Sequence, residues 1–184
     1  PFKIEKHQAV EELSKWMKHR WLAPNDLKIL YQSDKLQAIY IPYWTYDANT
    51  LSTYTARGGR YYYETRVVNG KKEQIQKIRW YPVSGYIHEF FDDVLVNASQ
   101  HHSDSIMSSV EPFNTDRLEP YRSEYISGYM AERYSLGVKE GFTFAKQKMQ
   151  RELEAAARRE VLHQYDTVSN INLHTRYENV TFKH

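Results

Sequence analysis

The sequence predicts an α+β fold, a mainly antiparallel meander sheet with a long C-terminal helix and an N-terminal helix packed on it. Three observations predict this class. The stretch from Leu36 to Ala56 is the longest run rich in β-branched and aromatic residues. The dipeptide Asn69-Gly70 is typical of a tight hairpin turn. Apolar residues recur at helical spacing from Val138 to about His163. With 184 residues, the chain fits one domain with a sizeable core.

The first elements follow from their apolar patterns. A helix is predicted from Glu5 to about Arg20, because apolar residues there recur on one helical face. The segment from Ala38 to Tyr46 carries apolar side chains on both faces. Such a strand is usually covered on both sides, so we place it at the centre of the sheet.

The next segment is interpreted as a hairpin. Gly58-Gly59 predicts a corner, and a second strand is expected from Tyr61 to Val68. A two-residue turn at Asn69-Gly70 would place Arg66 opposite Glu73, a favourable cross-strand charge pair. One face of this hairpin is expected to pack and the other to be wet. The packed face is predicted to carry Tyr61, Tyr63, Val67, Ile78 and Trp80.

The rest of the chain completes the meander. Pro82 and Gly85 predict a further corner, and a strand with a bulge near Asp92-Asp93 is expected from Tyr86 to Val96. A short helix is predicted from about Ser103 to Val110. The segment from Tyr125 to Tyr129 is compatible with a short strand or a buried turn. The alternating segment from Asn170 to Phe182 is predicted to be the closing strand.

Composition excludes several classes of protein. The net charge of +2 gives no global field toward nucleic acid or an anionic membrane, and the chain has no cysteine for a disulfide or thiolate metal site. No run of about 20 apolar residues predicts a membrane span, and no signal peptide opens the chain. We expect a cytoplasmic protein. Because the sequence starts at Pro1 and stops within a predicted strand, we expect residues 1–184 to be a single domain from a longer protein.

No catalytic or metal motif is present. Arg57-Gly58-Gly59-Arg60 precedes a predicted strand, whereas a phosphate-binding loop needs a helix after it. The cluster of His101, His102 and Asp104 is better explained by solvated residues at a helix start. Asp92 and Asp93 are neighbours on a strand and should face opposite ways. We therefore predict no catalytic residue, metal ligand or cofactor. An enzyme would require a pocket that brings His88, Asp92 or His101 together.

Two surfaces remain as candidates for binding. The wet face of the hairpin carries basic residues around Tyr62, and such a face can track a nucleic-acid backbone and stack a base. Its proposed nucleic-acid contacts are Arg60, Arg66, Lys77 and Arg79. Glu64 and Glu73 dilute this signal. The second surface is aromatic, since the chain contains 16 tyrosines, and exposed Tyr and Trp supply rigid contact area for proteins. Its predicted residues are Tyr43, Trp44, Tyr46 and Tyr62.

Several segments resemble a family of uncharacterised bacterial proteins over essentially the whole chain. They are PFKI at 1–4, YIPYWTYD at 40–47, RWYPVSG at 79–85, FFDDVLV at 90–96, EPF at 111–113, LEPY at 118–121, YISGY at 125–129 and NVTFKH at 179–184. The resemblance implies that CxxC zinc ribbons precede this region and that a strand-rich segment, and sometimes a membrane segment, follows it. Members are often labelled primosomal protein N′ (replication factor Y-like) or TFIIB-type zinc-ribbon protein. The helicase label fails on this sequence, which has neither a phosphate loop nor a DExH motif.

The sequence therefore predicts a non-enzymatic scaffold or protein-interaction module of a bacterial zinc-ribbon protein. An aromatic patch would be buried against a protein partner, and the basic hairpin would tune the encounter. The competing hypothesis is single-stranded nucleic-acid binding through the hairpin. Membrane association is expected only through parts outside this chain, and the oligomeric state is left open.

Overall fold

The protein has an α+β fold with a three-stranded antiparallel sheet, a long helix in the C-terminal region and a short N-terminal helix. The computed structural model describes residues 4–18, 36–68, 71–99, 106–107, 109–111, 113, 115 and 119–184. The chain divides into two compact units, Pro1–Pro42 with Asn114–Tyr134, and Tyr43–Phe113 with Ser135–His184. The single domain and the packing of the N-terminal helix on the sheet stay predictions.

The first unit holds short elements. Helix α1 spans Lys6–Lys18 and confirms the predicted N-terminal helix. Strand β1, Ile39–Tyr40, pairs in parallel with β4, Met130–Ala131. The ambiguous segment near Tyr125 forms the 3₁₀ helix η2, Ser123–Tyr125, followed by a turn.

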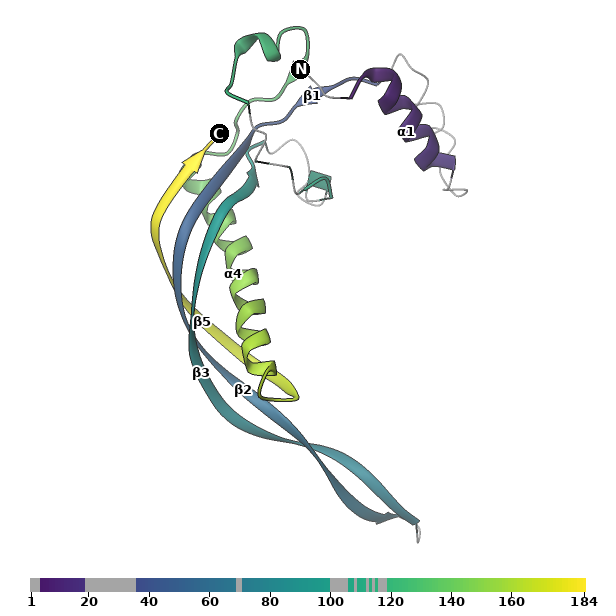
Figure 1. Ribbon diagram of the computed structural model, residues 1–184, viewed down its shortest axis with the longest axis vertical. Helices are drawn as coiled ribbons and strands as arrows, with labels where there is room; N and C mark the ends of the chain where they lie inside the picture. The colour runs from purple at the N-terminus through teal and green to yellow at the C-terminus, as the bar shows by residue number, and fades with distance from the viewer. Residues whose placement is uncertain are drawn as a thin grey trace. The chain divides into compact units, whose positions relative to one another are not determined.

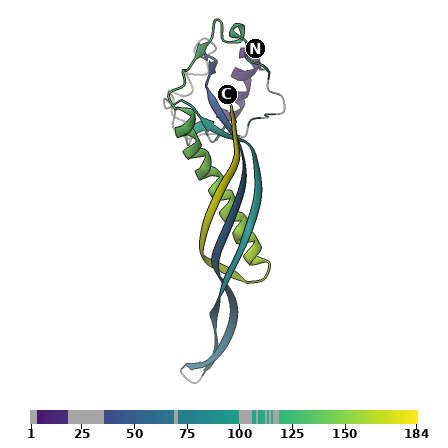
Figure 2. The ribbon, with the colours of Figure 1, turned by 90° about the vertical axis from the view of Figure 1, so that its left-hand side faces the viewer.

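The second unit is built on one central strand. Strand β2, Tyr43–Val68, lies between β3, Lys71–Asn97, and β5, Thr167–Lys183, and both pairings are antiparallel (Figures 1 and 2). The predicted central strand is therefore confirmed over its second part. Arg66 pairs with Glu73, as predicted from a two-residue turn at Asn69-Gly70, although the turn residues themselves lie outside the described residues.

Two predicted corners are wrong, because β2 and β3 run straight through them. Gly58 and Gly59 pair with Tyr81 and Trp80 in the middle of the hairpin. A Cβ atom at Gly59 would lie 2.7 Å from the Ile78 side chain and 2.9 Å from Trp80, so this glycine makes room for neighbours rather than a turn. Pro82 is tolerated within β3 because β3 is an edge strand.

Bulges, rather than corners, bend the sheet. Asp93, Asn170 and Asn179 have φ values of 52°, 53° and 51°, and each lies at a register shift of the ladder. Left-handed residues at bulges bend a strand and increase its twist. The bulge predicted near Asp92-Asp93 is confirmed. The strands curve around one side, where the long helix lies (Figure 1).

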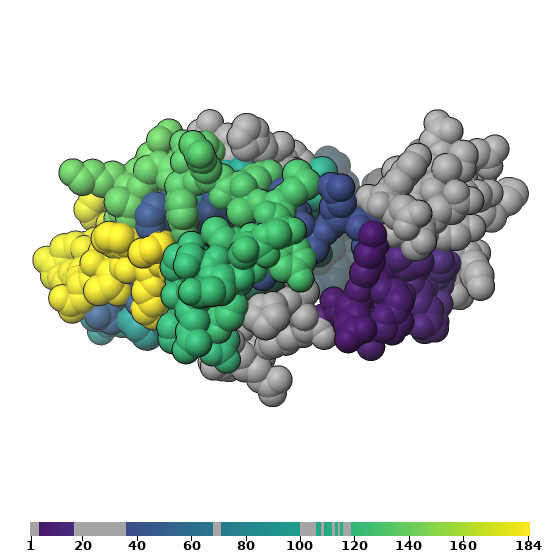
Figure 3. All heavy atoms as spheres, turned by 90° about the horizontal axis from the view of Figure 1, so that it is seen from above, coloured from purple at the N-terminus to yellow at the C-terminus, as the bar shows by residue number. Residues whose placement is uncertain are grey.

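Helix α4, Val138–Leu162, confirms the predicted long helix and covers one face of the sheet. Its buried residues recur at every fourth position. They are Gly141, Ala145, Met149, Leu153, Ala157 and Val161. This stripe packs on the even-numbered side chains of β2, including Tyr46, Ala48, Tyr54 and Ala56. Figure 3 shows spheres of α4 beside those of β5.

Two further predictions concern segments that the structure covers little or not at all. His101, His102 and Asp104 lie outside the described residues, as do half of the positions of the helix expected at Ser103–Val110. Among the residues that are described, no helix combines the length and apolar character that a bilayer span requires.

Candidate interaction surface

The β2–β3 hairpin extends beyond the rest of its unit as a two-stranded arm, residues 60–68 and 71–79. The pairing of β2 with β5 ends at Gly59 and Thr167, and α4 ends at Leu162. Beyond this point only β2 and β3 pair with each other (Figure 1). The Tyr61 amide donates to Asp166 Oδ2 at 2.8 Å, which closes the end of the β5 pairing. An isolated two-stranded ribbon is marginally stable in water, so the arm gains stability when a partner covers it.

The face of the hairpin that points away from α4 is uncovered within its unit. We call it the open face, and it consists of the odd-numbered residues of β2 from Asn49 to Val67 and the even-numbered residues of β3 from Lys72 to Phe90. Of these residues only Gly59 is buried. Tyr86, Tyr63 and Phe90 are 71%, 63% and 59% exposed. Proteins seldom expose so many aromatic rings on one face, and such patches often mark binding sites.

The open face contains no acidic side chain. Its cationic residues are Arg57 and Lys72, and His88 adds an imidazole. The Arg57 guanidinium lies 5.8 Å from the centre of the Trp80 ring, and the rings of Tyr86 and His88 meet edge to face at 6.0 Å. This composition, aromatic and depleted of acidic charge, is typical of the core of a protein interface.

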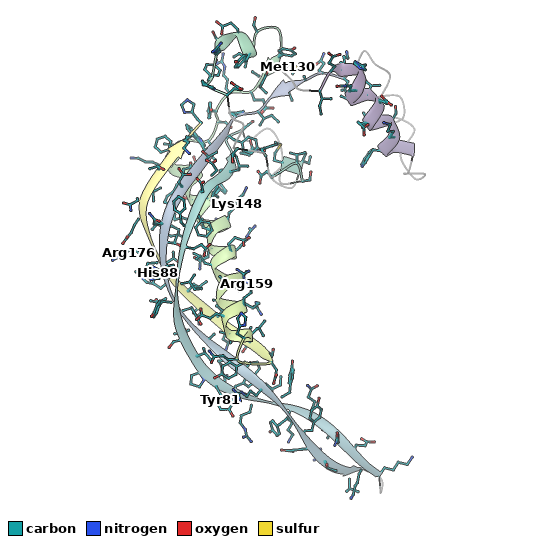
Figure 4. The ribbon with its side chains drawn as sticks, in the orientation of Figure 1. Tyr81, His88, Met130, Lys148, Arg159 and Arg176 are labelled. Carbon is teal, nitrogen blue, oxygen red and sulfur yellow. The ribbon has the colours of Figure 1, made fainter. Side chains whose placement is uncertain are left out.

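Strand β5 extends the same face across the sheet. Leu51 pairs with His88 on one side and Arg176 on the other, so these three residues form one row. Figure 4 shows His88 and Arg176 on the side of the sheet away from α4. The Arg176 guanidinium is paired with Glu178 at 2.5 Å, which neutralises its charge locally.

The four predicted nucleic-acid contacts lie together on the other face of the arm. Arg60 pairs with Arg79, and Arg66 pairs with Glu73. Lys77 forms an ion pair with Glu64, and the Arg79 guanidinium lies 5.1 Å from the centre of the Tyr62 ring. The arm's cations on this face are therefore partly satisfied within the arm. Whether they bind nucleic acid stays a prediction.

The expected division of the hairpin into a packed face and a wet face is wrong in the arm. The register does sort the side chains as predicted, since Tyr61 pairs with Ile78. Both faces are nevertheless largely exposed, including Tyr61, Val67 and Ile78. The reason is that neither α4 nor β5 reaches this part of the hairpin.

The residues of the predicted interaction surface separate in the structure. Tyr46 is 1% exposed, and its hydroxyl donates to the Val138 carbonyl at 2.6 Å. Burial raises the pKa of Tyr46. Trp44 is half-buried, and its Nε1 donates to the Leu136 carbonyl at 2.9 Å. Tyr46 thus belongs to the core and offers a partner no area, which corrects its prediction as a surface residue.

The other two members lie far apart along β2. The Tyr43 ring meets Phe113 edge to face at 5.2 Å at the start of the strand, whereas Tyr62 lies in the arm. The open face was missed because the false corners at Gly58-Gly59 and Pro82 concealed two unbroken strands. The residues of β3 from Lys72 to Phe90 do not alternate strictly between apolar and polar types, so the sequence carried no clear signal for this face.

An acidic cluster lies at the bulge of β3. Carboxylate oxygens of Asp47, Asp92 and Asp93 all lie within 4.8 Å of one another, which is close enough to hold a cation. The Lys183 ammonium already lies 3.5 Å from Asp47 and 3.4 Å from Asp93. The Thr181 hydroxyl also donates to Asp47 Oδ2 at 2.9 Å. The cluster is therefore occupied by the protein's own donors.

These contacts shift the pKa values of two carboxyl groups, Asp47 and Asp92, in opposite directions. Burial opposes ionisation of Asp47, but hydrogen bonds from the Asp93 amide and Thr181, with the charge of Lys183, outweigh it and lower the pKa of Asp47. Desolvation and the neighbouring charges of Asp93 and Asp47 raise the pKa of Asp92. Hydrogen bonds and ion pairs therefore stabilise the bulge.

Comparison with known proteins gives one distant relative and no activity. No family model matches the chain, and no solved structure matches it. The chain is 28% identical over 151 residues to the uncharacterized protein YdjG of Bacillus subtilis (strain 168), which is a distant homology. The match covers 81% of this chain and 42% of YdjG, so the chain spans about two fifths of that relative's length.

Proposed function

We propose that this chain is a non-enzymatic protein-interaction module that binds a partner through the open face of its β2–β3 hairpin. The observation that carries the proposal is the exposure of Tyr63, Tyr86 and Phe90 on a face with no acidic residue. Tyr and Phe are enriched in interfaces, because a ring supplies large contact area at low cost in conformational entropy. The projecting arm adds a second reason, since two strands alone gain most from being covered.

We further propose that the module is part of a bacterial zinc-ribbon protein and acts there as a scaffold. The resemblance of its sequence segments supports this wider context. The greater length of YdjG is also consistent with additional regions in such proteins. The cytoplasmic location likewise stays a prediction, supported by the lack of cysteine.

The test is affinity capture with the full-length protein from its own cells. Replacing Tyr86 and Phe90 with Ser should lower the recovered amount of specific partner proteins at least about tenfold, because two exposed aromatic anchors are lost. The control is Phe144→Ser, which changes an exposed aromatic residue on α4. The proposal would be contradicted if partners were still captured by Tyr86→Ser/Phe90→Ser but were no longer captured by Phe144→Ser.

A second candidate is single-stranded nucleic-acid binding, favoured by the charge of the arm. Residues 60–79 contain six cationic and two acidic side chains, a net charge of +4 in a chain of net charge +2. Aromatic rings beside cations can stack bases and track phosphates. This candidate predicts that an oligothymidylate binds and that affinity falls steeply with salt. Loss of binding in Arg66→Glu/Lys77→Glu/Arg79→Glu would favour the face predicted from the sequence.

A further inference from the structure

The lack of carboxylates on the open face restricts what can cover it. Its twenty positions on β2 and β3 include Arg57 and Lys72 but no Asp or Glu, whereas the opposite face of the arm carries Glu64 and Glu73 among its cations. Acidic residues are thus absent from the open face, which ends before Asp47 and Asp92 at the β3 bulge. A partner must satisfy the cations that the open face leaves without a carboxylate.

A second copy of the chain does not meet this requirement. Two open faces packed against each other would bring Arg57 and Lys72 toward rows that carry no acidic group, because the flanking carboxylates of Asp47 and Glu178 already pair with Lys183 and Arg176. Burying cations against cations costs free energy in desolvation and in repulsion. The open face is therefore not self-complementary.

Nucleic acid fits the open face less well than protein does. The face extends over nineteen residues of each strand, which corresponds to roughly 60 Å at about 3.3 Å per residue. Only two permanent cations, Arg57 and Lys72, serve that length. Affinity for a nucleic-acid backbone depends on one cation for each neutralised phosphate. The surface is rich in aromatic rings and sparse in cations, which favours apolar side chains with a few carboxylates.

We propose that the open face binds an acidic protein segment, with its carboxylates on Arg57 and Lys72 and its apolar side chains on Tyr61, Tyr86 and Phe90. The Arg57 guanidinium is exposed and lies over the Trp80 ring, 5.8 Å from the ring centre. Such a stacked guanidinium keeps its N–H groups in one plane, where they can bind a carboxylate with two hydrogen bonds. This inference rests on the proposed function and names the chemistry of the partner.

The experiment uses the full chain and two labelled peptides, an acidic one that repeats Glu-Leu-Glu-Tyr and a basic one that repeats Lys-Leu-Lys-Tyr. Fluorescence anisotropy should give an affinity for the acidic peptide at least about tenfold higher than for the basic one. Arg57→Glu/Lys72→Glu should reverse that preference. The matched control, Arg66→Glu/Lys77→Glu, makes the same change in net charge on the opposite face and should change binding by less than about twofold.

Three outcomes would overturn the inference. Equal affinities for the two peptides would show that the open face does not require an acidic partner. Equal weakening by the two double variants would assign the effect to net charge rather than to the open face. Tighter binding of an oligothymidylate that is also lost in Arg57→Glu/Lys72→Glu would assign the face to nucleic acid. If captured partners are lost in Tyr86→Ser/Phe90→Ser but kept in Arg57→Glu/Lys72→Glu, the proposed function stands and only the acidic partner fails.

Discussion

Gly141 determines how closely α4 approaches the sheet. A Cβ atom at this position would collide with the Tyr46 hydroxyl and would lie 3.3 Å from Trp44 Cδ1. Tyr46 in turn donates to the carbonyl of Val138, in the first turn of the same helix. The glycine and the tyrosine therefore act as a pair, although neither the sequence spacing nor the residue types predict it.

This pair can be tested with a double-mutant cycle. Gly141→Ala should lower the free energy of unfolding, because the collision costs about 1–3 kcal/mol and exceeds the gain in helix propensity. In a Tyr46→Phe background the same change should instead be close to neutral or stabilising, since the hydroxyl is gone. Urea denaturation measures both. Gly137→Ser is the control, because a Cβ atom there meets nothing within 4 Å. Additive effects would contradict the proposed collision.

The carboxyl groups at the β3 bulge should give opposite dependences on pH. The folded state lowers the pKa of Asp47, so its contribution is complete well above its ordinary pKa of about 4 and is lost as pH falls through the lowered value. Asp47→Asn should therefore cost about 1–2 kcal/mol at pH 7 and progressively less in acid. Denaturation curves at several pH values check this.

Asp92 provides the contrasting variant at the same bulge. The folded state raises the pKa of Asp92, so its ionised form at pH 7 opposes folding. Asp92→Asn should raise the free energy of unfolding slightly at pH 7, and this gain should vanish in acid. A loss of stability in Asp92→Asn at pH 7 would show that Asp92 supports the bulge.

At the scale of elements, α4 is held by a single stripe of buried residues. Leu153 is fully buried in the core, whereas Leu162 is 43% exposed at the end of the same helix. Leu153→Ala should destabilise the protein by about 2–5 kcal/mol, and Leu162→Ala by less than about 1 kcal/mol. Thermal unfolding of the two variants measures the difference. Equal losses would contradict the packing of α4 on the sheet.

The arm should be the least protected part of the hairpin. Its backbone pairs on one side only, and both of its faces are exposed. Amide hydrogens of Tyr61–Val67 should exchange at least ~100-fold faster than those of Thr50–Ala56, which lie between two strands. Hydrogen exchange followed by mass spectrometry tests this, and similar protection in both segments would indicate that something else supports the arm.

The helices and the register of the hairpin could be predicted from the sequence, because they depend on local patterns. The stripe of α4 and the pairing of Arg66 with Glu73 are examples. The continuity of β2 through Gly58-Gly59 could not be predicted, since these glycines make room for Tyr165 and for side chains of β3 and β5. Glycine signals a turn or a close approach equally well, and only the fold decides between them.

At the scale of the whole molecule, the candidate site depends on which face of a long hairpin α4 covers. The sequence predicted aromatic contact residues, but Tyr46 lies in the core, and the exposed aromatic rings of the open face come from both strands. The distribution of charge follows the same division, with acidic residues on one face of the arm only. These properties appear only when the two strands are aligned in register.

The most direct test of the open face is site-specific photo-crosslinking in cells that produce the full-length protein. A photoreactive phenylalanine at Tyr86, and separately at Phe90, should give the same partner adduct. The same group at Phe144, which is exposed on α4, should not give that adduct. An adduct confined to the two open-face positions is the predicted result. Equal adducts at all three positions, or an adduct only at Phe144, would contradict the account.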